Sequence, residues 1–149
     1  MEINFDQVIE NSKLLISQDD IVYTGSTALT VYGMLPNYIQ EPFSIINFES
    51  LNDNLDLNVF YPISTVNRIY SDDIFIINGI KLASPGKAMI DLLLSGKIDD
   101  IVELLEYSGI SSEAITLRSY IQKYNLTNII KNIIKNYNLE EFSDVLLKE

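Results

Sequence analysis

Two short apolar runs, separated by Asn78-Gly79, organise the hydrophobic pattern of this chain. The runs are Ile74–Ile77 and Ile80–Ala83. Asn-Gly favours a type I′ turn, because that turn needs positive φ at both central residues. The pattern therefore predicts a β-hairpin centred on Asn78-Gly79.

A capped helix is expected directly after the hairpin. Ser84 is suited to the N-cap, and Pro85 to the first helical position, where its missing N–H costs nothing. Apolar residues follow at helical spacing as far as Gly96, which is suited to end the helix.

The segment before the hairpin alternates short helices with short strands. A first helix is expected after a capping box of Asn4 and Gln7, with an apolar stripe that includes Phe5 and Ile9. A buried strand at residues 21–23 is expected to lead through a tight turn into a second helix.

Two further strands are predicted by local pattern. Residues 43–46 form an apolar run, and residues 55–61 alternate apolar and polar side chains. Pro62 limits the second of these strands to an edge or an end of the sheet. Residues 66–70 are a third, shorter strand candidate.

The pattern in the last third of the chain predicts helices. Apolar stripes at helical spacing run through residues 98–105, 115–124 and 126–137, and Asn138 with Glu141 is a second capping box. We therefore expect one domain over residues 1–149, of the α/β (α+β) class. A small mixed sheet packed by helices occupies residues 1–96, and a helical part occupies residues 97–149.

The amino-acid composition, and above all the net charge, limits the kinds of partner that the protein can bind. The chain has 149 residues, is 47% hydrophobic and carries a net charge of −11. Residues 1–60 hold nine acidic residues and one basic residue. The electrostatic field of this negative charge repels nucleic-acid phosphates, so direct DNA binding is not expected. The same negative charge attracts a basic protein partner.

The sequence contains no Cys and no His. Disulfides, thiolate chemistry, the usual zinc ligands and imidazole-based triads are therefore excluded. No apolar run approaches the ~20 residues of a membrane span, and no signal peptide is recognisable. We expect a cytoplasmic protein with no membrane contact, no metal site, no cofactor and no assigned catalytic residue.

A turn between the first strand and the second helix is a candidate anion or nucleotide site. It consists of Thr24, Gly25 and Ser26, with Ser26 as the expected helix cap, and resembles the Gly-Ser turn that grips phosphates in nucleotidyltransferases. Such enzymes hold Mg²⁺ with two carboxylates at alternate strand positions, whereas here Asp56 is followed by the amide Asn58. The alternative is an ordinary strand-to-helix turn.

Exposed acids are the candidate partner-binding residues. They are Glu41, Glu49, Asp53, Asp72 and Asp73, of which Asp53 or Asp73 could also supply a second carboxylate near Asp56.

Asp91 lies inside the apolar helix that follows the hairpin. We interpret it as an ion-pair partner of Lys87 or Arg68, or as a cap for neighbouring backbone where the helix meets the sheet, and the alternative is a catalytic carboxylate.

Two ordered motifs resemble the C-terminal domain of AbiEi-type antitoxins, which belong to type IV toxin–antitoxin systems of abortive infection. The first is Ser26-Thr27-Ala28-Leu29-Thr30-Val31-Tyr32-Gly33-Met34. The second is the strand ending at Ala83 followed by Ser84-Pro85-Gly86-Lys87-Ala88-Met89-Ile90-Asp91-Leu92. The similarity spans residues 20–130, and Ser84, Pro85, Lys87 and Asp91 are the family-motif residues. Gly86 stands where the family usually has Glu. The winged-helix domain that usually precedes this region is not expected in the first 20 residues.

The resemblance implies a non-enzymatic antitoxin-like protein that antagonises a toxin or a nucleic-acid-binding effector by protein–protein contact. One alternative is a minimal nucleotidyltransferase-like enzyme, which would need Mg²⁺ and a nucleotide. Another is a phage-borne acidic inhibitor, such as an anti-CRISPR protein, that imitates nucleic-acid charge.

Overall fold

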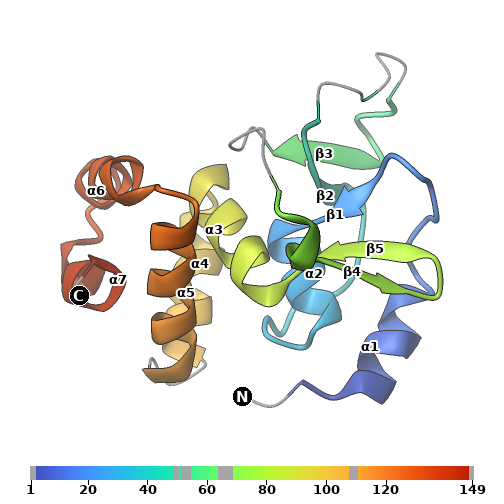
Figure 1. Ribbon diagram of the computed structural model, residues 1–149, viewed down its shortest axis with the longest axis horizontal. Helices are drawn as coiled ribbons and strands as arrows, with labels where there is room; N and C mark the ends of the chain where they lie inside the picture. The colour runs from blue at the N-terminus through green and yellow to red at the C-terminus, as the bar shows by residue number, and fades with distance from the viewer. Residues whose placement is uncertain (1–2, 49–50, 52–54, 64–68, 108–110, 148–149) are drawn as a thin grey trace.

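A mixed five-stranded sheet and a group of helices beside it form the molecule. A computed structural model describes residues 3–48, 51, 55–63, 69–107 and 111–147. The strands are β1 (Val22–Tyr23), β2 (Phe43–Ile46), β3 (Phe60–Ile63), β4 (Ile74–Ile77) and β5 (Ile80–Ala83). Their order in the sheet is β3-β2-β1-β5-β4, so β3 and β4 are the edge strands (Figure 1).

Parallel and antiparallel pairs both occur in this sheet. β1 pairs with β5 and β2 with β3 in parallel, whereas β1–β2 and β4–β5 are antiparallel. The prediction of a small mixed sheet packed by helices is therefore confirmed.

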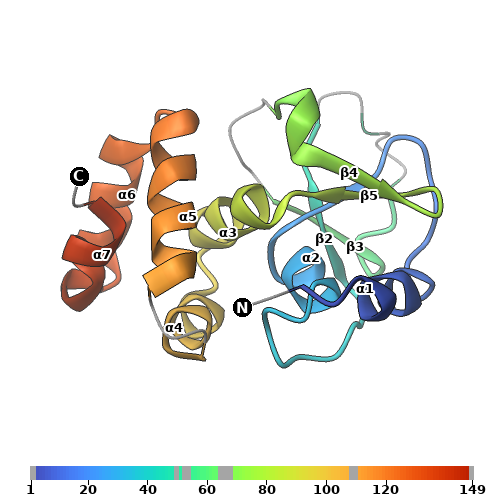
Figure 2. The ribbon, with the colours of Figure 1, turned by 60° about the horizontal axis from the view of Figure 1, so that its bottom comes forward.

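The helices divide between one face of the sheet and a separate group. α1 (Phe5–Ser12) and α2 (Gly25–Val31) cover one face (Figure 2). α3 (Pro85–Ser95) leads from the sheet to the helical group, which contains α4 (Ile98–Tyr107), α5 (Ser111–Lys123), α6 (Thr127–Asn136) and α7 (Ser143–Leu147). Short 3₁₀ turns, η1 (Ser71–Asp73) and η2 (Glu140–Phe142), precede β4 and α7.

The hairpin and the helix after it form as the sequence predicts. Asn78 and Gly79 have φ of 51° and 79°, as a type I′ turn requires. Ser84 accepts the backbone N–H of Lys87, Pro85 occupies the first turn, and Gly96 ends the helix in the left-handed conformation. These local rules fix the entry and the exit of α3.

Some boundaries differ from the predictions. The strand expected at residues 55–61 begins only at Phe60, because the Asp56 carbonyl accepts the N–H groups of Val59 and Phe60 in a turn. Pro62 does lie in an edge strand, as predicted. Of the candidate strand at 66–70, residues 69 and 70 are not in a strand, and residues 66–68 lie outside the described residues.

Two expected caps were also wrong. Thr24, and not Ser26, occupies the N-cap of α2. Asn138 has a φ of 56° and follows the end of α6, where the Leu139 N–H bonds the Ile134 carbonyl. Asn138 therefore closes one helix in a Schellman arrangement instead of opening the next.

The first helix begins as predicted but exposes part of its apolar stripe. The Asn4 side chain accepts the Gln7 N–H, whereas the Gln7 side chain bonds Asn11 and does not return to Asn4. Val8 is buried, but Phe5 and Ile9 are exposed. α1 thus presents apolar side chains to its surroundings as well as to the core.

Candidate functional site

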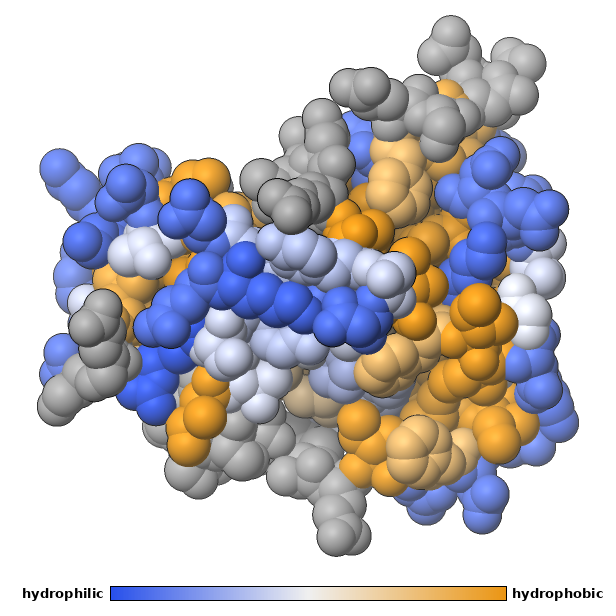
Figure 3. Space-filling view, in the orientation of Figure 1, coloured by the Kyte–Doolittle hydropathy of each residue, from blue (hydrophilic) through white to orange (hydrophobic). Residues whose placement is uncertain are grey.

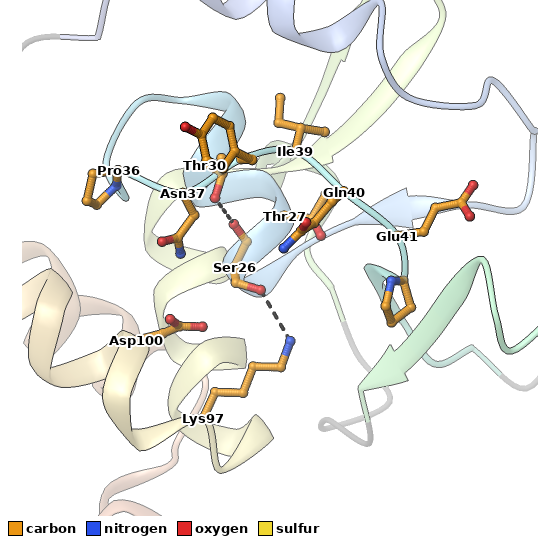
Figure 4. A pocket seen from close by; sticks show the side chains of 12 residues that line it. Ser26, Thr27, Thr30, Pro36, Asn37, Ile39, Gln40, Glu41, Lys97 and Asp100 are labelled. Carbon is orange, nitrogen blue, oxygen red and sulfur yellow. Dashed lines mark hydrogen bonds between the residues drawn. The ribbon is translucent and has the colours of Figure 1, made fainter.

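A hollow of about 460 Å³ lies between α2, the loop of residues 36–42 and the start of α4 (Figure 4). Ser26 lines it, and the Lys97 amine lies 3.4 Å from the Ser26 Oγ and 3.5 Å from the Ser44 Oγ. Glu41 and Asp100 also line the hollow. The Lys97 ammonium and the Ser26 hydroxyl could hold a small anion, whereas Ser44 is fully buried and the two carboxylates oppose an anion's charge.

Lys97 was not recognised from the sequence as a site residue. It lies 71 positions after Ser26 and 53 after Ser44, and the fold brings the three together. Its position directly after the helix-ending Gly96 was the available signal, because a residue beyond a helix end is free to turn toward another element. The Lys97 amine also lies 5.2 Å from the centre of the Tyr61 ring.

Thr24 and Gly25 support this hollow from behind. Thr24 is buried, and its hydroxyl donates to Asp91 Oδ2 at 2.6 Å. Gly25 has a φ of +55°, and a Cβ there would lie 2.8 Å from Ile63 Cδ1. These two residues are therefore structural requirements of the turn, whereas Ser26 is the member that faces the hollow.

Asp56 lies apart from this cluster. Its carboxylate accepts the N–H of Asn58 in the turn before β3, and its side chain is exposed. It is not among the residues that line the hollow with Ser26. Thus the structure brings Ser26 together with Lys97 and Ser44, and does not place Asp56 with them.

The motif residues of α3 form a buried ionic junction. The Lys87 amine donates to Asp91 Oδ1 at 2.6 Å, and both side chains are fully buried. The interpretation of Asp91 as a partner of Lys87 is therefore confirmed, while Arg68 lies outside the described residues. Thr24 bonds the second carboxylate oxygen, so this junction ties α2 to α3.

Asp73 forms a second buried polar cluster. Only 1% of its surface is exposed, and its carboxylate accepts four side-chain hydrogen bonds. The donors are Tyr124 at 2.6 Å, Tyr120 at 2.8 Å, Lys123 at 2.9 Å and Ser84 at 3.1 Å. Burial alone would raise the pKa of Asp73, but these hydrogen bonds outweigh it and lower the pKa below its ordinary value.

The expected acidic partner surface is therefore smaller than predicted. Asp73 is engaged inside the protein and does not belong to that surface. Glu41 and Asp72 are exposed, whereas Glu49 and Asp53 lie outside the described residues. Asp72 lies 3.5 Å from Lys123, at the rim of the buried cluster.

An apolar surface at the β4 edge was not anticipated as a site. Phe75 and Ile76 of β4 are 40% and 67% exposed, and Phe5 of α1 is 70% exposed. Figure 3 shows apolar side chains gathered over the β4–β5 hairpin and α1. We call Phe5, Ile9, Phe75 and Ile76 the hairpin–α1 surface. Its signal in the sequence was the uninterrupted run of four apolar residues, which alone cannot tell an edge strand from a central one.

A second hollow, of about 490 Å³, adjoins this surface. Ile74 and Ile76 line it together with Val22 and Phe48, and its polar lining residues are Asp19, Asp20, Ser71 and Lys81. The Lys81 amine donates to the Asp19 carbonyl at 2.8 Å. Asp19 and Asp20 are exposed, so the rim of this apolar hollow carries two carboxylates beside the Lys81 ammonium and is acidic on balance.

Neither the described side chains nor the similarity of the chain to known proteins assigns a function. Within the described part of the chain, no three acidic, Cys or His side chains are grouped so as to hold a metal ion. None of the described helices combines the length and the apolar character that crossing a membrane requires. No family model, curated protein or solved structure matches the chain.

Proposed function

We propose that this chain is a non-enzymatic, antitoxin-like protein that acts by contact with a protein partner. The observation that carries the proposal is the hairpin–α1 surface. Large apolar side chains exposed on both faces of the edge strand β4 and on α1, as at Phe75, Ile76 and Phe5, are typical of interaction sites. The resemblance of the two sequence motifs to AbiEi-type antitoxins supplies the biological context, antagonism of a toxin or a nucleic-acid-binding effector.

The charge of the chain supports a basic partner. A net charge of −11 raises the association rate with a cationic protein and disfavours direct contact with DNA. The acids beside the apolar surface, Asp19 and Asp20, lie where a partner would meet them. We infer a cytoplasmic complex in which apolar contacts stabilise binding and acidic residues steer it.

Coexpression with a candidate toxin tests this proposal. The toxin should be a nucleotidyltransferase-type protein encoded beside this chain's gene, and the measurements are growth rescue and copurification. We expect Phe5→Ser with Ile76→Ser to abolish both. Ile115→Ser, which changes an exposed apolar residue on α5, is the matched control and should retain both. A folded wild-type chain that neither rescues growth nor copurifies would contradict the proposal.

Salt dependence separates this function from the acidic-inhibitor alternative. Binding through the apolar surface should survive a change from about 0.1 M to about 1 M salt with a modest loss. An inhibitor that imitates nucleic acid should lose most of its affinity over the same range, because its contacts are between charges.

Nucleotide binding is a second candidate, favoured by the position of Lys97 beside Ser26. An ammonium 3.4 Å from a hydroxyl in an open hollow is a plausible contact for a phosphate oxygen. Calorimetry with ATP or CTP and Mg²⁺ tests it. Heat that disappears in Lys97→Met and persists in Lys13→Met would support this candidate, and the absence of heat with the wild type would remove it.

A further inference from the structure

Among the described residues, no hydrogen-bond partner is found for the backbone groups on the outer side of β4. β4 is the last strand on its side of the sheet. Ile77 pairs with Ile80 next to a two-residue turn, and at the other end of the hairpin the Ser84 N–H donates to the Asp73 carbonyl. Hydrogen-bonded and non-hydrogen-bonded residue pairs alternate along an antiparallel hairpin, so the backbone groups of Ile77, Phe75 and Asp73 face β5. The N–H and C=O groups of Ile74 and Ile76 therefore point away from the sheet.

Strand β4 itself lacks three of the features that protect edge strands. Charged residues, Pro and bulges discourage pairing with a further strand. β4 consists of Ile74-Phe75-Ile76-Ile77 and has none of these, and its register with β5 is regular over all four residues. The opposite edge contrasts with it, because β3 contains Pro62.

The two faces beside the edge differ in chemistry. Phe75 points to the face covered by α1 and α2, where its ring packs edge-on to Tyr32 at 6.5 Å. Ile74 and Ile76 point to the other face and line the apolar hollow whose rim carries Asp19 and Asp20. A strand added to β4 would therefore meet an apolar hollow and an acidic rim on that face.

We propose that β4 is the docking edge for an extended segment of a basic protein partner. The segment adds to the sheet as a sixth strand, places an apolar side chain in the hollow beside Ile76, and directs a Lys or Arg to Asp19 and Asp20. This inference rests on the proposed function, since it identifies how the partner is held. Addition of a strand to an exposed edge is a known mode of peptide recognition, in which backbone bonds give affinity and side-chain pockets give specificity.

A second copy of this chain is the weaker occupant. Antiparallel pairing of β4 with its own copy would bring two acidic rims and two chains of net charge −11 together. Like charges brought together disfavour such a contact, whereas a cationic segment complements the rim.

Fluorescence anisotropy with designed peptides tests this docking edge on the full chain. The probe, called the valine–lysine peptide, is a labelled ten-residue peptide in which valine and lysine alternate at every second position and threonine fills the positions between, so that both side chains can reach the face of the hollow. Its controls are the valine–glutamate peptide and a valine–lysine peptide with N-methylated backbone amides, which keeps the side chains but cannot donate to β4. We expect the first peptide to bind, the N-methylated peptide to bind at least about tenfold more weakly, and the glutamate peptide not to bind.

Protein variants separate specific docking from attraction by overall charge. Asp19→Asn with Asp20→Asn should weaken the valine–lysine peptide several-fold. Glu140→Gln with Glu141→Gln removes the same charge from an exposed pair on η2 and should leave the affinity unchanged. Ile76→Pro removes an outward N–H without removing a hairpin bond, and should abolish binding. Circular dichroism establishes whether this variant is folded, and if it is not, the N-methylated peptide supplies the same test.

Several outcomes would overturn the inference. Equal binding of the N-methylated and unmodified peptides would do so, as would equal losses in the two charge-pair variants, or no binding of any peptide. A chain that sediments as a dimer and becomes monomeric in Ile76→Pro would show that a second copy is the occupant. If a toxin partner remains bound to folded Ile76→Pro and to the Asp19/Asp20 variant, the inference that β4 is the docking edge is wrong, and the proposed function still stands. Failure of the wild type to hold any toxin would instead remove the proposed function.

Discussion

The α2–α3 junction and the β4 edge differ in what they bury and what they expose. At the junction, the charged side chains of Lys87 and Asp91 are fully buried. At the edge, the large apolar side chain of Ile76 is mostly exposed. Charged side chains are usually exposed and large apolar side chains are usually buried, so both places depart from the usual distribution. The difference shows that the charges of the junction are paired inside the fold, whereas the β4 edge leaves a large apolar side chain in contact with solvent.

The same contrast separates motif residues from contact residues. The two family-like motifs meet physically, because Thr24 before the first motif bonds Asp91 of the second. Tyr32 of the first motif also donates to the carbonyl of Ala83 at 2.6 Å. Their spacing in the sequence therefore reflects a structural junction. Variants of the two regions should separate stability from binding.

The largest effect is expected from Asp91→Asn. The substitution keeps the shape of the side chain but removes the carboxylate charge that the buried Lys87 ammonium contacts at 2.6 Å. Loss of one partner from a buried ion pair costs about 3–5 kcal/mol of unfolding free energy. Urea unfolding measures it, and Glu140→Gln at an exposed site should change the same quantity by less than about 0.5 kcal/mol.

A double variant sharpens this prediction. Replacing Lys87 by Met and Asp91 by Leu removes both charges and retains bulk, so it should recover most of the loss caused by Asp91→Asn. If Asp91→Asn cost less than about 1 kcal/mol, the junction would not be the stabilising centre that the buried pair indicates.

A smaller loss is expected from Gly86→Ala. Gly86 lies in the first turn of α3, and an added Cβ would overlap the ring of Tyr120 on α5. Overpacking of this kind costs about 1–3 kcal/mol. Gly33→Ala is a useful comparison, because a Cβ at Gly33 meets nothing within 4 Å and the cost there arises from its φ of +79°. Leu in place of Tyr120 should reduce the loss in Gly86→Ala if the ring is its cause.

Acid unfolding should report the buried Asp73. Its folded-state pKa is lowered, so the unfolded chain takes up a proton at a higher pH than the folded chain does. The stabilisation is complete above the unfolded pKa of about 3.9 and is lost as pH falls through the lower folded pKa. Asp73→Asn should be less stable near neutral pH and should lose stability less steeply below about pH 4. Parallel curves for the two proteins would contradict this role.

Local rules predicted the hairpin, the N-cap of α3 and its end, because each depends on a few adjacent residues. Alternation misled the prediction at residues 55–61, where the Asp56 carbonyl forms a turn that gives the same pattern. The pairing of Asp91 with Lys87 could also be predicted from the sequence, since residues four apart lie on the same face of a helix.

Sites that depend on the order of the strands in the sheet could not be predicted from local sequence patterns. The run Ile74–Ile77 predicts a strand equally well in the centre or at the edge of a sheet, and the exposure of Ile76 follows only from the edge position. The contact of Lys97 with Ser26 likewise joins segments with no local relation. Asp73 was predicted among the partner-binding acids together with Asp72, but its carboxylate accepts hydrogen bonds from the Tyr120 hydroxyl of α5 and the Tyr124 hydroxyl directly after that helix.

The smallest effect on stability is expected at Ile76, although its effect on binding should be the largest. Ile76→Thr keeps a β-branched side chain in a strand and changes an exposed position, so the unfolding free energy should shift by less than about 0.5 kcal/mol. The same variant removes apolar contact with the hollow and should weaken the valine–lysine peptide. Urea unfolding and anisotropy on one preparation measure both quantities. A large loss of stability would mean that Ile76 packs as core in solution, and the edge would then resemble the junction instead of contrasting with it.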